Sequence, residues 1–182
     1  MIKTLLTSAV AVLALAATGC GGSSSDTTTT ASPTDEWAAG FCTAVTTWTD
    51  SIKSVGDELK NPSSLSQDGL QSAADDVKSA TTQFVDDVKG LGAPDTESGE
   101  EIKTSVDELS TTLETESADI ETAAQGVSSV TDLPGAITTV SKSLSAMGTS
   151  FSSTLSTIQN ADAKGELQTA LQDSPECASI SS

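Results

Sequence analysis

From residue 32 onward, apolar side chains recur every three or four positions along the chain. This spacing matches the 3.6-residue turn of an α-helix and predicts helices with one apolar face. The first apolar face comprises Trp37, Phe41, Val45, Trp48, Ile52, Val55 and Leu59. Ser32 and Pro33 suit its N-cap and first helical position, and Asn61 before Pro62 should end it, because the residue preceding a proline disfavours helical geometry.

Three more apolar faces follow, and short segments with helix breakers separate them. The second comprises Leu70, Ala73, Val77, Thr81, Phe84, Val88 and Leu91. The third comprises Ile102, Val106, Leu109, Leu113, Ile120, Ala124 and Val127. The fourth comprises Ile137, Val140, Leu144, Met147, Phe151, Leu155 and Ile158. We expect the second helix to end within Gly90–Pro94, Ser98 and Glu101 to form a capping box for the third, and the fourth to begin near Thr131–Pro134.

Four helices of similar length with short connections match an up-down-up-down four-helix bundle. A short fifth helix around residues 163–171 should lead through Ser174 and Pro175 to Cys177. We therefore expect an all-α fold with one domain, long enough to bury a continuous core. The alternative is a longer, partly splayed helical hairpin whose exposed apolar face awaits a partner.

The N-terminus carries a different signal. A basic start with Lys3 precedes the largely apolar run Leu5–Ala17, which ends in the motif AATGC at residues 16–20. This motif resembles the lipobox of bacterial lipoproteins, although Ala17 stands where leucine is usual. The resemblance implies that residues 1–19 are a signal peptide, that Cys20 takes a lipid, and that the mature protein is held at the outer face of the cytoplasmic membrane.

Two alternatives account for the N-terminus less well. As a transmembrane helix the apolar run would rise about 20 Å, whereas a bilayer core needs about 30 Å. Ordinary secretion with cleavage after Ala14-Leu15-Ala16 would leave Cys20 unexplained. We expect residues 20–33, which contain no large apolar side chain, to form a flexible tether, and residues 34–178 to form the helical bundle domain. The composition resembles small surface lipoproteins of actinobacteria, and this resemblance carries no functional residue beyond Cys20.

The charge balance excludes some partners. Removal of residues 1–19 takes away Lys3, so seven lysines and 26 acidic residues leave −19 on the mature side chains. Such a charge repels nucleic acid and anionic lipid, and without arginine the chain lacks the bidentate fork that suits phosphate. We expect no nucleic-acid partner and, at most, loosely held divalent cations.

Cys42 and Cys177 remain once Cys20 is assigned to the lipid. Export favours a disulfide between them, and the bundle topology brings the end of the fourth helix beside the start of the first. The alternative, a redox pair, lacks the usual C-x-x-C spacing. We therefore expect a structural disulfide that closes a loop of about 135 residues.

Catalytic chemistry has little support in this composition. The chain has no histidine and no tyrosine, which excludes Ser-His triads and His-ligated zinc. The carboxylate pairs Asp75-Asp76 and Asp86-Asp87 belong to solvated helix faces. Residues 160–165 imitate the start of a calcium loop, but Lys164 and Leu171 fall where oxygen ligands are needed, so we interpret this segment as a turn. We expect no catalytic residue, no metal site and no cofactor.

One candidate binding site remains, inside the bundle. Counting along antiparallel helices places Trp48, Thr81, Ser117 and Gly148 at a similar depth, where small and polar residues would line a cavity against the indole. The alternative is a close-packed core in which the indole fills the space over Gly148. The favoured function is a non-enzymatic envelope lipoprotein that binds or positions another envelope component, either a protein or a small ligand. The alternative is a small-molecule or lipid carrier with a cavity in the bundle.

The lipobox resemblance gives the first testable prediction. Replacing Cys20 by Ser removes the thiol that would accept the diacylglyceryl group, so the protein should move from the membrane fraction to the soluble fraction. Cell fractionation with intact-mass measurement checks this. A Cys20→Ser protein that stays in the membrane fraction with an acyl mass shift would rule the assignment out.

Overall fold

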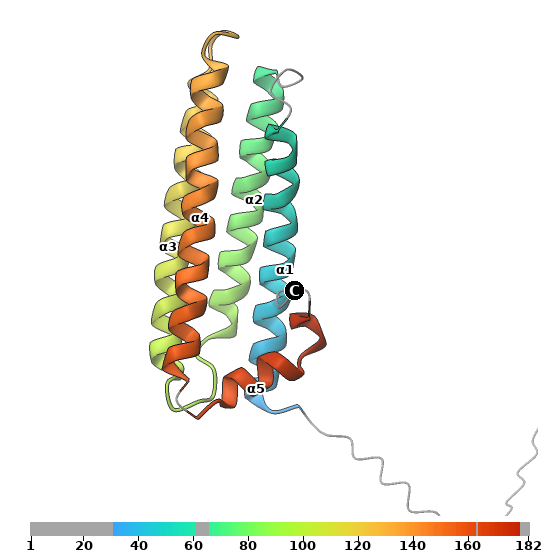
Figure 1. Ribbon diagram of the computed structural model, residues 1–182, viewed down its shortest axis with the longest axis vertical. Helices are drawn as coiled ribbons and strands as arrows, with labels where there is room; N and C mark the ends of the chain where they lie inside the picture. Colours follow the sequence, from blue (N-terminus) through green and yellow to red (C-terminus); the bar gives the residue numbers. More distant parts are fainter. Residues whose placement is uncertain (1–30, 61–65, 163, 179–182) are drawn as a thin grey trace, which may run out of the picture. The chain divides into compact units, whose positions relative to one another are not determined.

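A computed structural model describes residues 31–60, 66–162 and 164–178 of the chain. The expected signal peptide, Cys20 and most of the expected tether lie outside these residues. The described part is all-α, without strands (Figure 1). Its helices are α1 (Pro33–Leu59), α2 (Gln67–Leu91), α3 (Gly99–Gln125), α4 (Leu133–Ala161), α5 (Glu166–Asp173) and the 3-10 helix η1 (Pro175–Cys177). The four long helices predicted from the apolar spacing are confirmed, as is the short fifth helix expected around residues 163–171.

The start of α1 is fixed by the residues that the sequence singled out. The Ser32 hydroxyl accepts a hydrogen bond from the Asp35 amide (3.1 Å), and the Asp35 carboxylate accepts one from the Ser32 amide (2.8 Å). These bonds satisfy donors that the first helical turn leaves unpaired. The bond from the Ser32 amide to the carboxylate, with the Ser32 side chain beside it, lowers the pKa of Asp35. The folded unit therefore includes Ser32 and Pro33, ahead of the expected boundary at residue 34.

Two local expectations are wrong. Ser98 precedes α3, but its hydroxyl makes no capping bond and donates to the carbonyl of Ala161 at the end of α4 (2.6 Å). Its ψ of 13° also departs from the extended geometry of a typical N-cap. The segment expected to be a turn over residues 160–165 is shorter, because α4 continues through Ala161. The Ser98 hydrogen bond links the α2–α3 connection to the C-terminal end of α4.

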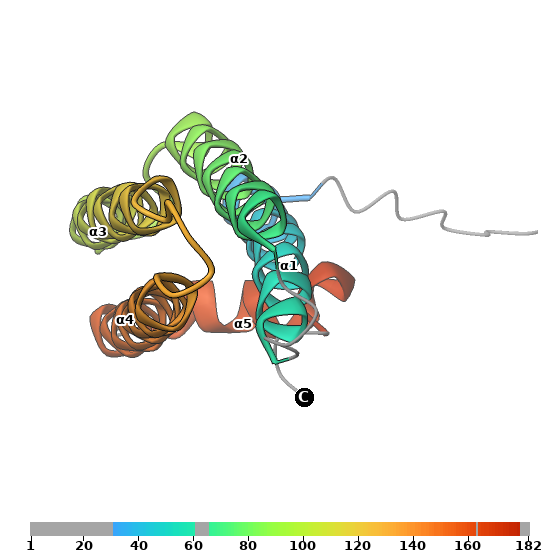
Figure 2. The ribbon, with the colours of Figure 1, turned by 90° about the horizontal axis from the view of Figure 1, so that it is seen from above.

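Consecutive long helices pack antiparallel to each other, which gives the up-down-up-down order of a bundle. The pairs α1–α2, α2–α3 and α3–α4 are in contact along their lengths, whereas α1 and α4 contact each other at few positions. Seen from above, α1 and α4 stand apart, and α5 crosses beneath them (Figure 2). The bundle is closed on three sides and only loosely closed on the fourth.

Burial along the predicted apolar faces follows this arrangement. All seven predicted positions of α3 and its C-terminal flank are buried, and α1 and α2 each have one exception, Ile52 and Leu91. The fourth face differs, because Ile137, Leu144, Phe151 and Leu155 of α4 are only partly buried. Three of these, Leu144, Phe151 and Leu155, face the loosely closed side of the bundle.

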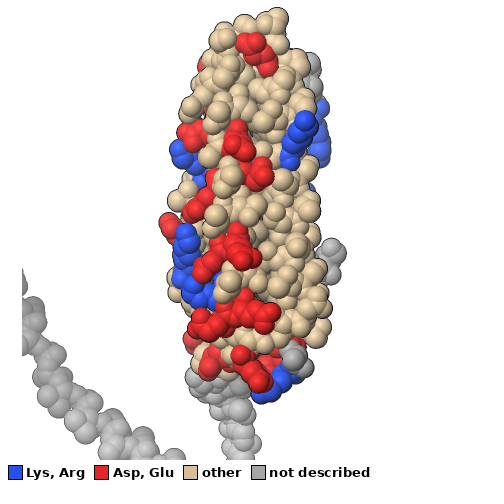
Figure 3. Space-filling model, turned by 90° about the vertical axis from the view of Figure 1, so that its left-hand side faces the viewer, with Lys and Arg blue, Asp and Glu red and all other residues tan. Residues whose placement is uncertain are grey.

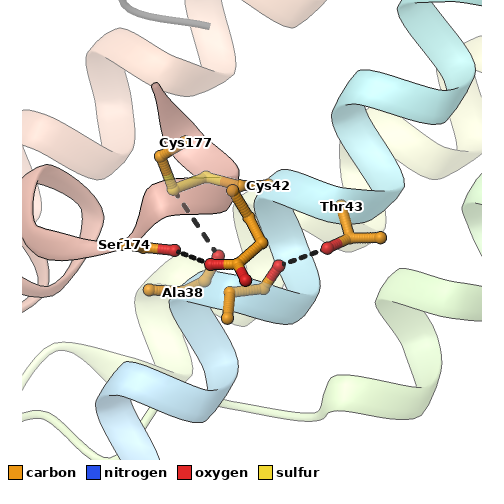
Figure 4. The surroundings of a disulfide bond; sticks show 7 residues. Ala38, Cys42, Thr43, Ser174 and Cys177 are labelled. Carbon is orange, nitrogen blue, oxygen red and sulfur yellow. Dashed lines mark hydrogen bonds between the residues drawn. A yellow bond between two sulfur atoms is a disulfide. The ribbon is translucent and has the colours of Figure 1, made fainter. Parts of the chain in front are cut away.

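The Cys42–Cys177 disulfide joins the chain end to α1. After α5 crosses the lower end of the bundle, η1 places Cys177 against α1 beside Ala38 (Figure 4). The two Cα atoms are 5.0 Å apart, and both side chains are buried. Because α5 and η1 also pack on α1, the disulfide completes a link from the end of α4 back to the first helix.

None of the helices in the described ranges contains a stretch that is long and apolar enough to cross a membrane.

The disulfide closes a loop with a sequence separation of 135 residues. Its removal by the double change Cys42→Ser and Cys177→Ser should lower the free energy of unfolding by about 2–5 kcal/mol, because the unfolded chain regains conformational entropy. Urea unfolding of the lipid-free Cys20→Ser chain, with and without the double change, measures the difference. Equal stability of the two proteins would contradict a structural role for the link.

Candidate ligand-binding groove

A groove with a volume of about 450 Å³ runs along the loosely closed side of the bundle, between α1 and α4. On α1 it is lined by Val45, Thr46, Trp48, Thr49, Asp50 and Ile52. On α4 it is lined by Leu144, Gly148, Phe151, Ser152 and Leu155. This volume lies within the range of about 300–1,000 Å³ that small-molecule sites occupy.

Trp48 forms a fixed wall of this groove. Its indole Nε1 donates a hydrogen bond to the Thr81 hydroxyl on α2 (3.3 Å), which satisfies the donor inside the core. Its ring lies 5.6 Å from the ring of Phe84 and 5.9 Å from that of Phe151, measured between centroids. The polar end of the indole is already paired and the side chain is only 4% exposed, so Trp48 contributes a small area of apolar ring to the groove wall.

Gly148 leaves the α4 wall open. It is exposed, and a Cβ atom added there would have no heavy atom within 4 Å. Leu144, Phe151 and Leu155 surround it along about three helical turns, which corresponds to about 16 Å. The side chain missing at Gly148 therefore leaves space between the apolar residues of α4 and those of α1.

The polar lining residues include hydroxyls and a single carboxylate. The Ser152 hydroxyl donates to the Gly148 carbonyl of its own helix (3.0 Å), so that this polar group is already paired. Asp50, on α1, is exposed and is the one charged residue in the lining. The groove thus combines an apolar interior with a small polar edge, which is the usual composition of a ligand site.

Of the four residues predicted to lie at a similar depth in the bundle, three belong to the groove or its support and one does not. Trp48 and Gly148 both line the groove, and Thr81 holds the indole from behind. Ser117 is buried on α3 and does not line the groove. The indole does not fill the space over Gly148, so a space is present on this side, but it is open to solvent at the side of the bundle.

Leu144, Phe151 and Leu155 were predicted to be core residues, and their place in the groove was not predicted. Their spacing on α4 is the same whether a helix or a ligand covers them. The one available signal is that no acidic residue occurs within α4 and that Lys142 is its only charged residue. A long helix without an acidic residue is unusual in a chain with a formal net charge of −18.

Charge is distributed unevenly over the described helices. Eight acidic residues lie on α3, where Figure 3 shows a column of carboxylates, beside a broad band over α4 that lacks them. Five lysines form exposed or half-exposed ion pairs, among them Lys78 with Glu121 (2.8 Å) and Lys164 with Glu97 (2.9 Å). Glu121 raises the pKa of Lys78 and Glu97 raises that of Lys164, but exposed pairs of this kind add at most about 1 kcal/mol of stability.

The carboxylates of α2 and of the α4–α5 turn are arranged for solvation and capping. Asp75, Asp76, Asp86 and Asp87 are all exposed. Asp162, at the third position of the calcium-like segment, accepts a hydrogen bond from the Gln168 amide (2.7 Å). In the described ranges no three histidine, cysteine or acidic residues come together as a metal site would require.

The chain matches no protein-family model, and comparisons with curated proteins and with solved structures also gave no match.

The Trp48–Thr81 hydrogen bond gives a stability prediction. Thr81→Val keeps the shape of the side chain but leaves the buried indole N–H without an acceptor, which should cost about 1–3 kcal/mol. Thr81→Ser keeps the hydroxyl and should lose less. Urea unfolding of the three proteins checks the order, and a valine variant as stable as the parent protein would show that the bond contributes nothing.

Proposed function

We propose that this protein is a non-enzymatic, lipid-anchored envelope protein that binds a small apolar molecule or a single lipid chain in the groove between α1 and α4. The observation that carries the proposal is the apolar groove itself. It lies on the side of the bundle where α1 and α4 contact each other at few positions. Leu144, Phe151 and Leu155 pack against the core but stay partly exposed. A bound apolar body would remove them from water.

The size of the groove favours a small ligand over a helix of a partner protein. A helix about 10 Å in diameter and 16 Å long occupies roughly 1,200 Å³. The groove has a volume of about 450 Å³ and is lined from α1 and α4 alone. A partner helix would therefore lie on the surface, whereas an extended chain or a small ring system fits between the walls.

The open side of the groove also suits a carrier that exchanges its ligand. An apolar molecule can reach Phe151 and Leu155 from the side without separation of packed helices. The reason is that α1 and α4 are held together mainly at their lower end by α5 and η1. A lipid anchor at Cys20, as the lipobox resemblance implies, would keep this groove close to a source of apolar molecules. The ligand is then the envelope component that the sequence led us to expect.

The lining supports binding without catalysis. It contains threonine and serine hydroxyls and the Asp50 carboxylate, but no lysine and no cysteine. The chain as a whole lacks histidine. A hydroxyl nucleophile needs an adjacent base, and the lining residues provide none besides the carboxylate of an exposed aspartate. Ligand retention and release are the functions that these residues support.

Filling the space over Gly148 tests the proposal. Gly148→Leu should weaken binding of the uncharged fluorescent probe N-phenyl-1-naphthylamine at least tenfold, because the new side chain occupies the groove. The fold should persist, since a Cβ at this position meets no neighbour and leucine favours a helix by up to about 1 kcal/mol over glycine. Fluorescence titration of the lipid-free Cys20→Ser chain gives the affinities.

Gly135→Leu is the matched control for this experiment. Gly135 lies on the same helix, is exposed and has no atom within 4 Å of an added Cβ, but it does not line the groove. The control should bind the probe as the parent chain does. Absence of saturable binding to the parent chain, or equal binding by the Gly148→Leu variant, would refute the proposed function.

A further inference from the structure

We propose that the ligand of this groove is a cationic amphiphile: an apolar body that lies along α4 and an ammonium-type group held beside Asp50. This inference rests on the proposed function and names the chemical class of the ligand. It starts from the chemistry of the lining, in which Asp50 is the one charged side chain among otherwise apolar and hydroxyl-bearing residues.

Asp50 is available to pair with a ligand. It is exposed on α1, and none of the ion pairs in the described part of the chain includes it. Lys53 lies three residues further along the same helix but is not part of the lining and does not pair with Asp50. A cation in the groove would therefore meet a carboxylate that no lysine already neutralises.

The aromatic residues of the groove also favour a positively charged ligand. The rings of Trp48 and Phe151 line the groove with Asp50 and lie 5.9 Å apart. The face of an aromatic ring carries partial negative charge and attracts cations, and here Phe151 is the partly exposed ring, whereas Trp48 is only 4% exposed. An ammonium group that bears alkyl substituents gains both from these rings and from the carboxylate.

The apolar body of the ligand is matched by α4. Leu144, Phe151 and Leu155 extend along about three turns, and the helix contains no acidic residue. An anionic amphiphile of the same length would fit this wall equally well, but its head group would meet Asp50 and the strongly negative field of the domain. The groove should therefore discriminate by head-group charge while it accepts the same chain.

The test compares three amphiphiles that share one chain: dodecyltrimethylammonium, the uncharged dodecyl maltoside, and dodecanoate. Isothermal titration calorimetry below their micelle concentrations, on the lipid-free Cys20→Ser chain at low ionic strength, should give the order ammonium, uncharged, carboxylate. The ammonium compound should bind about two- to fivefold more tightly than the uncharged one, as expected for one exposed ion pair. Tetramethylammonium alone, without a chain, should not bind.

Asp50→Asn should abolish most of the ammonium preference and leave the affinity for dodecyl maltoside unchanged. Asp119→Asn is the matched control, because it removes the same charge from an exposed position of α3 that belongs to no ion pair. This control should keep the preference. Thermal unfolding of both variants checks that the fold is intact.

The outcomes separate this inference from the proposed function. If the parent chain shows no ammonium preference, or if the preference survives Asp50→Asn, the cationic class is wrong, whereas saturable dodecyl maltoside binding that Gly148→Leu abolishes still supports an apolar site. If no amphiphile binds, the proposed function fails as well. An equal loss of preference in Asp50→Asn and Asp119→Asn would indicate attraction by the whole domain and overturn the role of Asp50.

Discussion

The link from the end of α4 through α5 and η1 to Cys42 is the constraint on which the rest of this fold depends. Three neighbouring pairs of long helices hold each other by packing along their lengths, but α1 and α4 contact each other at few positions. They are joined across the lower end by α5, by the contacts of η1 on α1, and by the Cys42–Cys177 disulfide. A covalent link at one end allows a side of the bundle to stay open above it without loss of the fold.

The open side has an energetic consequence. Leu144, Phe151 and Leu155 remain partly exposed, and apolar surface left in water forgoes about 25 cal/mol per Å². A closed bundle would recover this free energy by moving α4 toward α1. Instead, Trp48 is fixed by its bond to Thr81, and Gly148 contributes no side chain to fill the space. A ligand that covers these residues recovers the same free energy of apolar burial. It therefore stabilises the folded chain, and the stabilisation grows with its affinity and concentration.

Most of the helical architecture could be predicted from the sequence, because apolar spacing, Ser32 with Pro33, and the breakers around Gly92 act locally. The groove was only half predictable. Trp48 and Gly148 could be placed at one depth by counting along antiparallel helices, but the exposure of Phe151 depends on how far α1 stands from α4, which spacing does not determine. The prediction that Ser98 caps α3 was wrong for a similar reason. Its hydroxyl donates instead to the carbonyl of Ala161, which lies 63 positions away in the sequence.

The absence of acidic residues on α4 and the groove beside it have a common physical basis. A carboxylate at the edge of an apolar site would lose hydration when a ligand covers it, and a charge without a partner makes that loss costly. The hydroxyls of α4 avoid this cost, because Ser145, Thr149 and Ser152 each donate to a carbonyl one turn earlier in the same helix. Their hydrogen bonds persist whether water or an apolar body lies over them. On the α1 side, the one carboxylate of the lining can only be covered favourably by a group that replaces its lost hydration, and a cation does so.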